Sequence, residues 1–343
     1  KYFFMPALEG VTKDGSKLEL GFSCYGLKFF YLVDLWNELS DVEKYGWVAQ
    51  INSYQRNHSI YPKNSFIDEN YFNALTKSDF KDDLKYLIKL FINLTRIRTY
   101  DTKRMFRKKS INAETKQAIS TLFQIGSKNL REVEAEYDGD DRLLNYLNSL
   151  DWSQPWASGA QFSSLCVYSA TQESYNPETL KNFSNDLVDI DSGFYNKGYS
   201  VSNRQMFNGA MKVISGLDWI NHEIHYPEKI IDYCLTSKPI YEGCDIVDYI
   251  YVLNKCSKIS NYRKKEVVNI MTRLSNEMNT LYHNNLGGYS YFENKSQTHY
   301  YGVKITEGLN TPDIHATLLC TWANIMILDT IEGLDGKYKT LKP

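Results

Sequence analysis

The stretch NRQMFNGAMKVISGL at residues 203–217 opens with polar side chains and then becomes strongly apolar at helical spacing. A helix that is apolar on all sides must be surrounded by protein. Five further stretches share this pattern: GFSCYGLKFFYLVDLW at 21–36, AETKQAISTLFQIG at 113–126, GAQFSSLCVYSAT at 159–171, CDIVDYIYVLNKC at 244–256 and DIHATLLCTWANIMIL at 313–328. The sequence therefore predicts six buried helices.

These six stretches recur at a nearly constant interval. Their starts at positions 113, 159, 203 and 244 are 46, 44 and 41 residues apart. The first step, from 21 to 113, is 92 residues, twice 46, and a helix predicted at 80–96 fills it. The last step, from 244 to 313, is 69 residues and holds a longer partner helix and a loop. Such a period is typical of helical-repeat proteins.

Amphipathic helices alternate with the buried ones. We expect them at residues 43–55, 141–150, 177–187, 227–235 and 264–282. Pro177 and Pro227 suit the first turn of a helix, where no backbone N–H is needed. The alternation indicates inner and outer helices, so we predict an all-α fold, an (α/α)6 toroid of paired inner and outer helices around a central cavity, as a single domain over residues 1–343. An open solenoid would give the same local pattern.

Composition narrows the partners and the compartment. The formal net charge is −2, and the densest basic cluster, at 103–109, is expected to be a solvated loop between two helices, so we predict no nucleic-acid binding. The longest apolar runs are shorter than the ~20 residues of a membrane span. None of the six cysteines forms a CxxC pair, which favours buried thiols and a reducing, cytoplasmic location.

Two stretches resemble a known superfamily. WVAQINSYQ at 47–55, followed by SFID at 65–68, is similar to the outer-helix repeat of squalene cyclases and protein prenyltransferase β subunits. GGYSYF at 287–292 and HYYG at 299–302 resemble the turn and inner-helix signature of these terpenoid cyclase and prenyltransferase-like proteins. The resemblance implies an (α/α)6 toroid with a ligand cavity at one mouth. The same fold occurs in polysaccharide lyases and glycosidases, so the fold does not choose the reaction.

Candidate site residues follow from the toroid. All inner helices then point the same way, and their N-termini with free N–H groups converge on one mouth. Residues of the first inner turns and of the loops before them are Glu114, Gln161, Arg204, Asp245, Asp248, Asp313 and His315, with Trp152, Trp156, His299 and Tyr300. Glu114, Asp245 and Asp313 are equally suited to capping helices, and the two tryptophans to filling space between repeats.

The catalytic hypothesis concerns two carboxylates and two histidines. Asp245 and Asp248 share a helix face at i and i+3. We expect Asp248 or Asp245 to be a general acid and His299 or His315 a general base, provided that burial raises one carboxyl pKa toward neutrality. The remaining candidates are expected to bind substrate: Trp152, Trp156, Gln161, Arg204, Tyr300, Asp313 and Glu114.

Two short motifs have counterparts in related enzymes. Asp232-Tyr233-Cys234, followed by His299, has the spacing of the prenyltransferase zinc ligands, but Asp232 and Cys234 fall inside a predicted outer helix. We therefore expect no cofactor, with zinc as the alternative. The run DGDD at 138–141 matches the acid motif of class II terpene cyclases, yet it precedes an outer helix, where an acidic first turn explains it.

Three function classes remain open. The first is an enzyme with an acid/base site at the mouth, terpenoid-cyclase-like or prenyltransferase-like, acting on a hydrophobic or glycosyl substrate. The second is a carbohydrate-active lyase or glycoside hydrolase, and the third a non-catalytic binding module. The expected partner is a small molecule or oligosaccharide in the central cavity. No P-loop, dinucleotide fingerprint, serine nucleophile elbow or HExxH motif is present.

Overall fold

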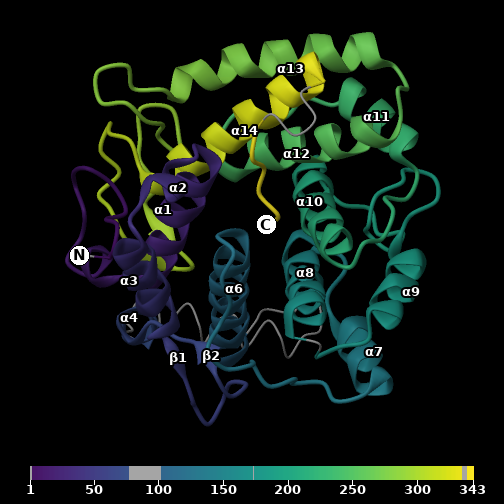
Figure 1. Ribbon diagram of the computed structural model, residues 1–343. Helices are drawn as coiled ribbons and strands as arrows, with labels where there is room; N and C mark the ends of the chain where they lie inside the picture. The colour runs from purple at the N-terminus through teal and green to yellow at the C-terminus, as the bar shows by residue number, and fades with distance from the viewer. Residues whose placement is uncertain (1, 77–101, 173, 334–337) are drawn as a thin grey trace.

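The computed structural model describes residues 2–76, 102–172, 174–333 and 338–343. These residues are mostly helical, which confirms the all-α class (Figure 1). The α-helices are α1 (Leu20–Leu32), α2 (Leu35–Glu38), α3 (Asp41–Asn52), α4 (Glu69–Thr76), α6 (Lys103–Gln124), α7 (Asp140–Ser149), α8 (Pro155–Gln172), α9 (Pro177–Leu187), α10 (Asn203–Trp219), α11 (Pro227–Thr236), α12 (Gly243–Ile259), α13 (Lys264–Met278) and α14 (Ile314–Glu332). The helix predicted at 80–96 lies outside the described residues.

Short elements complete the chain. Two 3-10 turns, η1 (Gly15–Lys17) and η2 (Asn279–Leu281), accompany the α-helices. The described part of the chain contains two antiparallel pairs of strands: β1 (Gln55–Arg56) with β2 (Ser65–Phe66), and β3 (His299–Tyr300) with β4 (Val303–Lys304). The second pair lies just before α14 in the chain and brings Tyr300 into the core, where only 3% of its surface is exposed.

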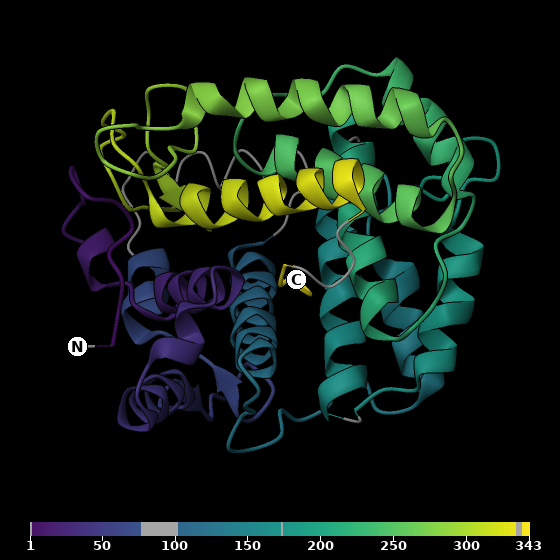
Figure 2. The same ribbon diagram turned by 45° about the horizontal axis from the view of Figure 1, so that its top comes forward.

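The six apolar stretches form α1, α6, α8, α10, α12 and α14. In α12 every residue from Ile246 to Asn254 is buried, so this helix is enclosed by protein on all sides. The amphipathic stretches form α3, α7, α9, α11 and α13. In α13 the buried residues Val267, Ile270, Met271 and Leu274 follow helical spacing along one face. Figures 1 and 2 show α13 on the outside, and it packs on α12 and α14.

Contacts among the six apolar helices are ordered along the chain. α1 packs on α6, α6 on α8, α8 on α10, α10 on α12, α12 on α14, and α14 on α1. An ion pair between Arg204 and Asp245 joins the first turns of α10 and α12, and one between Lys255 and Asp218 joins their last turns. These two helices therefore run in the same direction. Small residues allow α8 and α10 to approach closely: a Cβ at Gly209 would lie 2.7 Å from Cβ of Pro155.

The segment 338–343 lies among the apolar helices, as both ribbon views show (Figure 2). The backbone N–H of Lys342 donates to the side chain of Gln124, the last residue of α6, at 2.9 Å. The indole N–H of Trp219, the last residue of α10, donates to the carbonyl of Pro343 at 2.8 Å. The segment therefore connects the C-terminal ends of α6 and α10.

The basic cluster 103–109 is not a loop: α6 begins at Lys103, with Thr102 accepting a hydrogen bond from the N–H of Met105 at 3.2 Å. A good capping residue thus starts the helix earlier than the apolar pattern indicated.

Among the described helices, α14 is long and apolar enough by composition to cross a membrane, but it packs on α1, α12 and α13. Within the described ranges there is no clear membrane-spanning segment.

Candidate functional site

Aromatic side chains surround His315 near the starts of α12 and α14. The ring of Tyr25 stacks on the imidazole with centroids 4.3 Å apart and planes at 6°. Tyr291 lies 5.5 Å away on another side, and Nδ1 of His315 is hydrogen bonded to Oε1 of Gln297 at 3.1 Å. Burial lowers the pKa of His315 to about 3, so the imidazole is neutral at physiological pH.

The same aromatic group is open to solvent on one side. Tyr301 exposes 39% of its surface, and yet desolvation raises the pKa of its hydroxyl above the usual value. Tyr301 therefore lies where this buried aromatic group meets solvent. Tyr300 lies against Tyr301 with centroids 4.6 Å apart and meets Tyr25 edge-on at 6.3 Å. We call Tyr25, Tyr291, Tyr300, Tyr301 and His315 the aromatic recess.

Three lysines approach one another from different helices. Lys28 of α1, Lys116 of α6 and Lys212 of α10 form what we call the lysine cluster. Burial lowers the pKa of Lys28 to about 8 and that of Lys116 well below the usual range, and the charge of Lys212 lowers both further. Lys28 donates to Oγ of Ser120 at 3.0 Å, and Lys116 to Oγ of Ser163 at 2.8 Å. The sequence analysis did not select Lys28 or Lys116.

Asp248 faces this cluster from α12. Its side chain is 2% exposed, and its Oδ2 atom has no hydrogen-bond partner in the described part of the chain. Burial raises the pKa of Asp248 to about 7, the nearby Asp245 adds to this effect, and the charges of Lys212 and Lys116 oppose it. Lys212 also acts electrostatically on His315. The lysine cluster, Asp248 and the aromatic recess are therefore one electrostatically connected region.

Side chains next to this region connect three consecutive apolar helices, α8, α10 and α12. Oδ1 of Asp245 accepts hydrogen bonds from Nε of Arg204 at 2.9 Å and from Nδ2 of Asn208 at 2.7 Å. The guanidinium of Arg204 lies 5.2 Å from the ring of Trp156 on α8. Arg204 thus pairs with a neighbouring repeat while half of its side chain remains exposed. Asp245, Arg204 and Trp156 thus lie together at the starts of α12, α10 and α8, and Trp156 belongs to the first turn of α8 rather than to the loop before it.

Two predicted carboxyl residues have defined structural partners. Asp313 caps α14: its Oδ1 accepts from the N–H of Ala316, and its Oδ2 from the N–H groups of Tyr291 and Gln297. Burial raises the pKa of Asp313 to about 6, against these backbone donors. Glu114 lies within α6 rather than at its start, and its Oε1 accepts a hydrogen bond from the hydroxyl of Tyr300 at 3.2 Å.

Two further candidates lie away from the recess. Trp152 is 2% exposed, packs on Phe183, and donates its indole N–H to the carbonyl of Leu147 at 3.0 Å, so it fills space between α7 and α9. His299 is exposed on β3, where its Nδ1 is hydrogen bonded to Oγ1 of Thr298 at 3.0 Å. His299 makes no hydrogen bond to Asp248 in the described residues.

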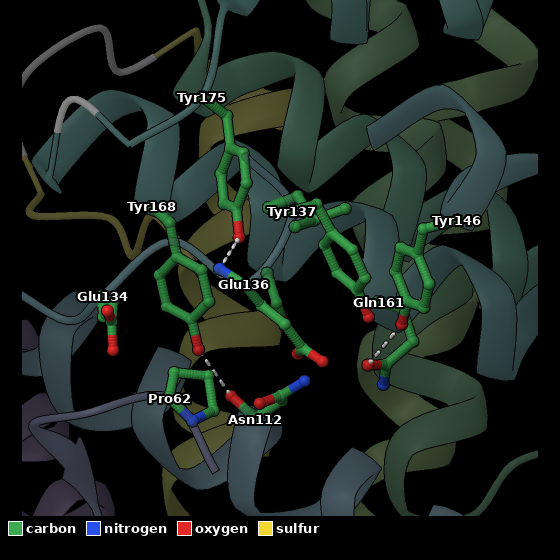
Figure 3. A pocket seen from close by; sticks show the side chains of 11 residues that line it. Pro62, Asn112, Glu134, Glu136, Tyr137, Tyr146, Gln161, Tyr168 and Tyr175 are labelled. Atoms are coloured by element: carbon green, nitrogen blue, oxygen red, sulfur yellow. Dashed lines mark hydrogen bonds between the residues drawn. The ribbon is translucent and has the colours of Figure 1, made fainter. Parts of the chain in front are cut away.

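Gln161 lines a separate small pocket between α6, α7 and α8 (Figure 3). Tyr146 donates to Oε1 of Gln161 at 3.3 Å, and the hydroxyl of Tyr175 accepts the N–H of Glu136 at 2.9 Å. The rings of Tyr137 and Tyr146 stack at 4.0 Å. The cavity volume of about 10 Å³ is enough for one water molecule, so this pocket accommodates solvent rather than a sugar ring.

The residues of the zinc and acid motifs have other partners. Asp232 forms an ion pair with Arg263 at 2.7 Å, and Cys234 is fully buried on α11. In the described ranges no three His, Cys, Asp or Glu side chains gather in the manner of metal ligands. Gly139 precedes the first turn of α7, and Oδ1 of Asp140 accepts the hydroxyl of Thr179 at 2.7 Å. The DGDD run therefore forms an acidic helix start. All six cysteines are free thiols.

No known protein family matches this chain, and no curated protein and no solved structure matches it either.

Proposed function

We propose that the chain is an (α/α)6 toroid whose mouth is the aromatic recess. The contacts from α1 through α6, α8, α10, α12 and α14 back to α1 support a closed inner ring. The ion pairs at both ends of α10 and α12 support inner helices that run in one direction. The near-regular spacing of the apolar stretches supports paired repeats.

We further propose that the protein is an enzyme that performs general acid/base chemistry on a carbohydrate substrate at this mouth. The observation that carries the proposal is Asp248: a buried carboxyl group, with an oxygen that lacks a hydrogen-bond partner among the described residues, whose pKa is raised to about 7. A group that gains and loses a proton near neutral pH is suited to proton transfer. Strongly perturbed carboxyl groups beside a recess are characteristic of active sites.

The polarity of the site favours a glycosyl substrate over an isoprenoid. Lys116 and Lys212 of the lysine cluster lie near Asp248. Lys116 donates to Oγ of Ser163, whose hydroxyl lies 3.0 Å from that of Ser215. An isoprenoid chain would displace water from these groups and offer no hydrogen bonds, which is unfavourable. Sugar hydroxyls replace those hydrogen bonds, and the apolar face of a sugar ring packs on tyrosine side chains. Conversion of a prenyl diphosphate, which a terpenoid-cyclase-like enzyme would show, is therefore the competing outcome of the test.

Each neighbour of Asp248 has a role in this proposal. A histidine whose pKa is about 3 is a poor proton acceptor at neutral pH, so His315 orients the substrate as a neutral hydrogen-bonding group. Its ring is held by Tyr25 and by Gln297. Arg204 and Trp156 form the entrance. Asp248 exchanges the proton.

The experiment is a substrate screen with two variants. Purified protein is incubated with neutral and acidic oligosaccharides and with prenyl diphosphates, and products are measured by mass spectrometry. We expect conversion of a saccharide, with a kcat that depends on a group of pKa near 7, and loss of this conversion in Asp248→Asn. Asp218→Asn, at the far end of α10, is the matched control and retains activity. Conversion of a prenyl diphosphate alone, or full activity of Asp248→Asn, contradicts the proposal.

A further inference from the structure

We propose that the lysine cluster binds a negatively charged group of the ligand, a carboxylate or a phosphate, so that the substrate of this site is an acidic or phosphorylated sugar. This inference deepens the proposed function and rests on it for the sugar. It concerns Lys28, Lys116 and Lys212, which come from α1, α6 and α10.

The first argument is the count of donors. An ammonium group has three N–H donors and no acceptor. Lys28 uses one donor on Ser120, and Lys116 uses one on Ser163. The Lys212 ammonium makes no hydrogen bond or ion pair with the residues that the structure describes. Most of the donors of the cluster are thus unused, and a carboxylate or a phosphate is the ligand group that consists of acceptors alone.

The second argument is the balance of charge. The negative charge of Asp248 raises the pKa of Lys116, whereas the positive charges of Lys28 and Lys212 lower it. The neighbouring Asp245 is held by Arg204 and Asn208. A single carboxyl group whose own pKa is raised to about 7 is a weak counter-charge for three lysine side chains, and a bound anion favours the protonated form of each lysine. A bound anion relieves their mutual repulsion, which is strong because the cluster is poorly solvated.

A neighbouring amide points to hydroxyl groups on the same ligand. Asn208 is 1% exposed, and its Oδ1 has no donor in the described part of the chain. It precedes Lys212 by one helical turn, at i and i+4, so both side chains lie on one face of α10. A ligand with a hydroxyl beside its anionic group satisfies both residues. This combination is present in sugar acids and sugar phosphates.

The test measures anion binding without reference to turnover. Inorganic phosphate, glucuronate and, as the neutral control, glucose are titrated into the protein by calorimetry and in thermal unfolding. We expect phosphate or glucuronate to bind and glucose to bind far more weakly. Lys212→Met weakens anion binding about tenfold or more, the loss of one charge-assisted hydrogen bond. Lys13→Met, at an exposed site, leaves it unchanged. Binding by phosphate but not glucuronate selects phosphorylated sugars, and the converse selects sugar acids.

The outcomes separate this inference from the proposed enzyme. Absence of binding by both anions to the wild-type protein overturns the inference, and this measurement needs no variant. Equal binding by wild type and Lys212→Met also overturns it. Asp248→Asn retains anion binding or tightens it, because a negative charge is removed beside the lysines. Anion binding through the lysines without turnover of any saccharide contradicts the proposed enzyme and supports the anion site. Turnover of neutral saccharides without anion binding supports the proposed enzyme and contradicts the anion site.

Discussion

Replacing Lys28 with methionine is expected to stabilise the unliganded protein. Lys28 is 7% exposed, and burial lowers its pKa from 10.5 to about 8. A pKa unit corresponds to about 1.4 kcal/mol, so holding this charge costs about 3 kcal/mol of folding free energy below pH 8. The change removes the hydrogen bond to Ser120, worth about 1 kcal/mol. The hydroxyl of Ser120 still donates to the carbonyl of Gln117, so the substitution leaves no buried donor without a partner at Ser120.

The net gain is therefore about 2 kcal/mol at pH 7. With an unfolding entropy of about 2.1 cal/mol/K per residue over 343 residues, Tm rises by about 3 °C. The gain depends on pH with a definite sign. The folded-state pKa of Lys28 lies below the unfolded value, so the unfolded chain binds more protons between about pH 8 and 10.5. Wild-type stability rises through this window, and the advantage of Lys28→Met disappears.

Thermal and urea unfolding followed by circular dichroism at pH 7 and pH 10 measure this effect. Lys28→Arg is the matched control, because it retains the charge and is expected to show no gain. Addition of inorganic phosphate stabilises the wild type by mass action and stabilises Lys28→Met less. A Tm that falls by several degrees at pH 7 would refute the reasoning, since it would mean that Lys28 holds the fold together as an ion-pair partner.

Two further predictions concern Trp152, which lies away from the recess, and Gly243, which contacts Tyr291. Trp152→Phe loses the hydrogen bond to the Leu147 carbonyl, so unfolding free energy falls by about 1 kcal/mol while substrate affinity is unchanged; weaker affinity at unchanged stability would instead assign Trp152 to the ligand. Gly243 has φ +46°, and a Cβ there would lie 2.1 Å from Cε1 of Tyr291. Gly243→Ala therefore costs about 1–2 kcal/mol in backbone strain alone, and displacement of the Tyr291 ring weakens substrate binding; unchanged unfolding and unchanged affinity would contradict the assigned contact.

Helix positions were predictable from the sequence because each depends on local composition. The outer helix Pro177–Leu187 agrees with its predicted bounds, since proline fixes its start and the apolar face gives its length. The start of α6 was not predictable in this way. Its first turns carry basic residues and little apolar pattern, and tertiary context makes them helical. The consequence for the site is direct, because Glu114 is a buried mid-helix residue and not a cap.

The site was only partly predictable, because contacts between residues far apart in the sequence decide which side chains meet. Position in the first turns selected Asp245 and Arg204, which form an ion pair, and His315, which stacks on Tyr25. Lys28 and Lys116 were missed because a single lysine in an apolar helix normally extends its ammonium to the surface. Only the packing of α1 on α6 and of α6 on α8 shows that these ammonium groups turn inward. The available signal was that each lies within a stretch otherwise predicted to be buried.

Glu114 and Asp248 are buried carboxyl groups whose pKa values differ because their charged neighbours differ. Burial raises the pKa of Glu114 well above the usual range, the charge of Asp68 raises it further, and the hydrogen bond from Tyr300 opposes this. Asp248 is buried to a similar degree, but the lysine cluster holds its pKa near 7. Glu114 therefore accepts the hydrogen bond that positions Tyr300, whereas Asp248 is able to change its charge at neutral pH. Environments that push two carboxyl groups apart in this way assign them different roles. Because lysines rather than backbone donors make that difference, an anion that binds them raises the pKa of Asp248, and substrate binding itself prepares the acid.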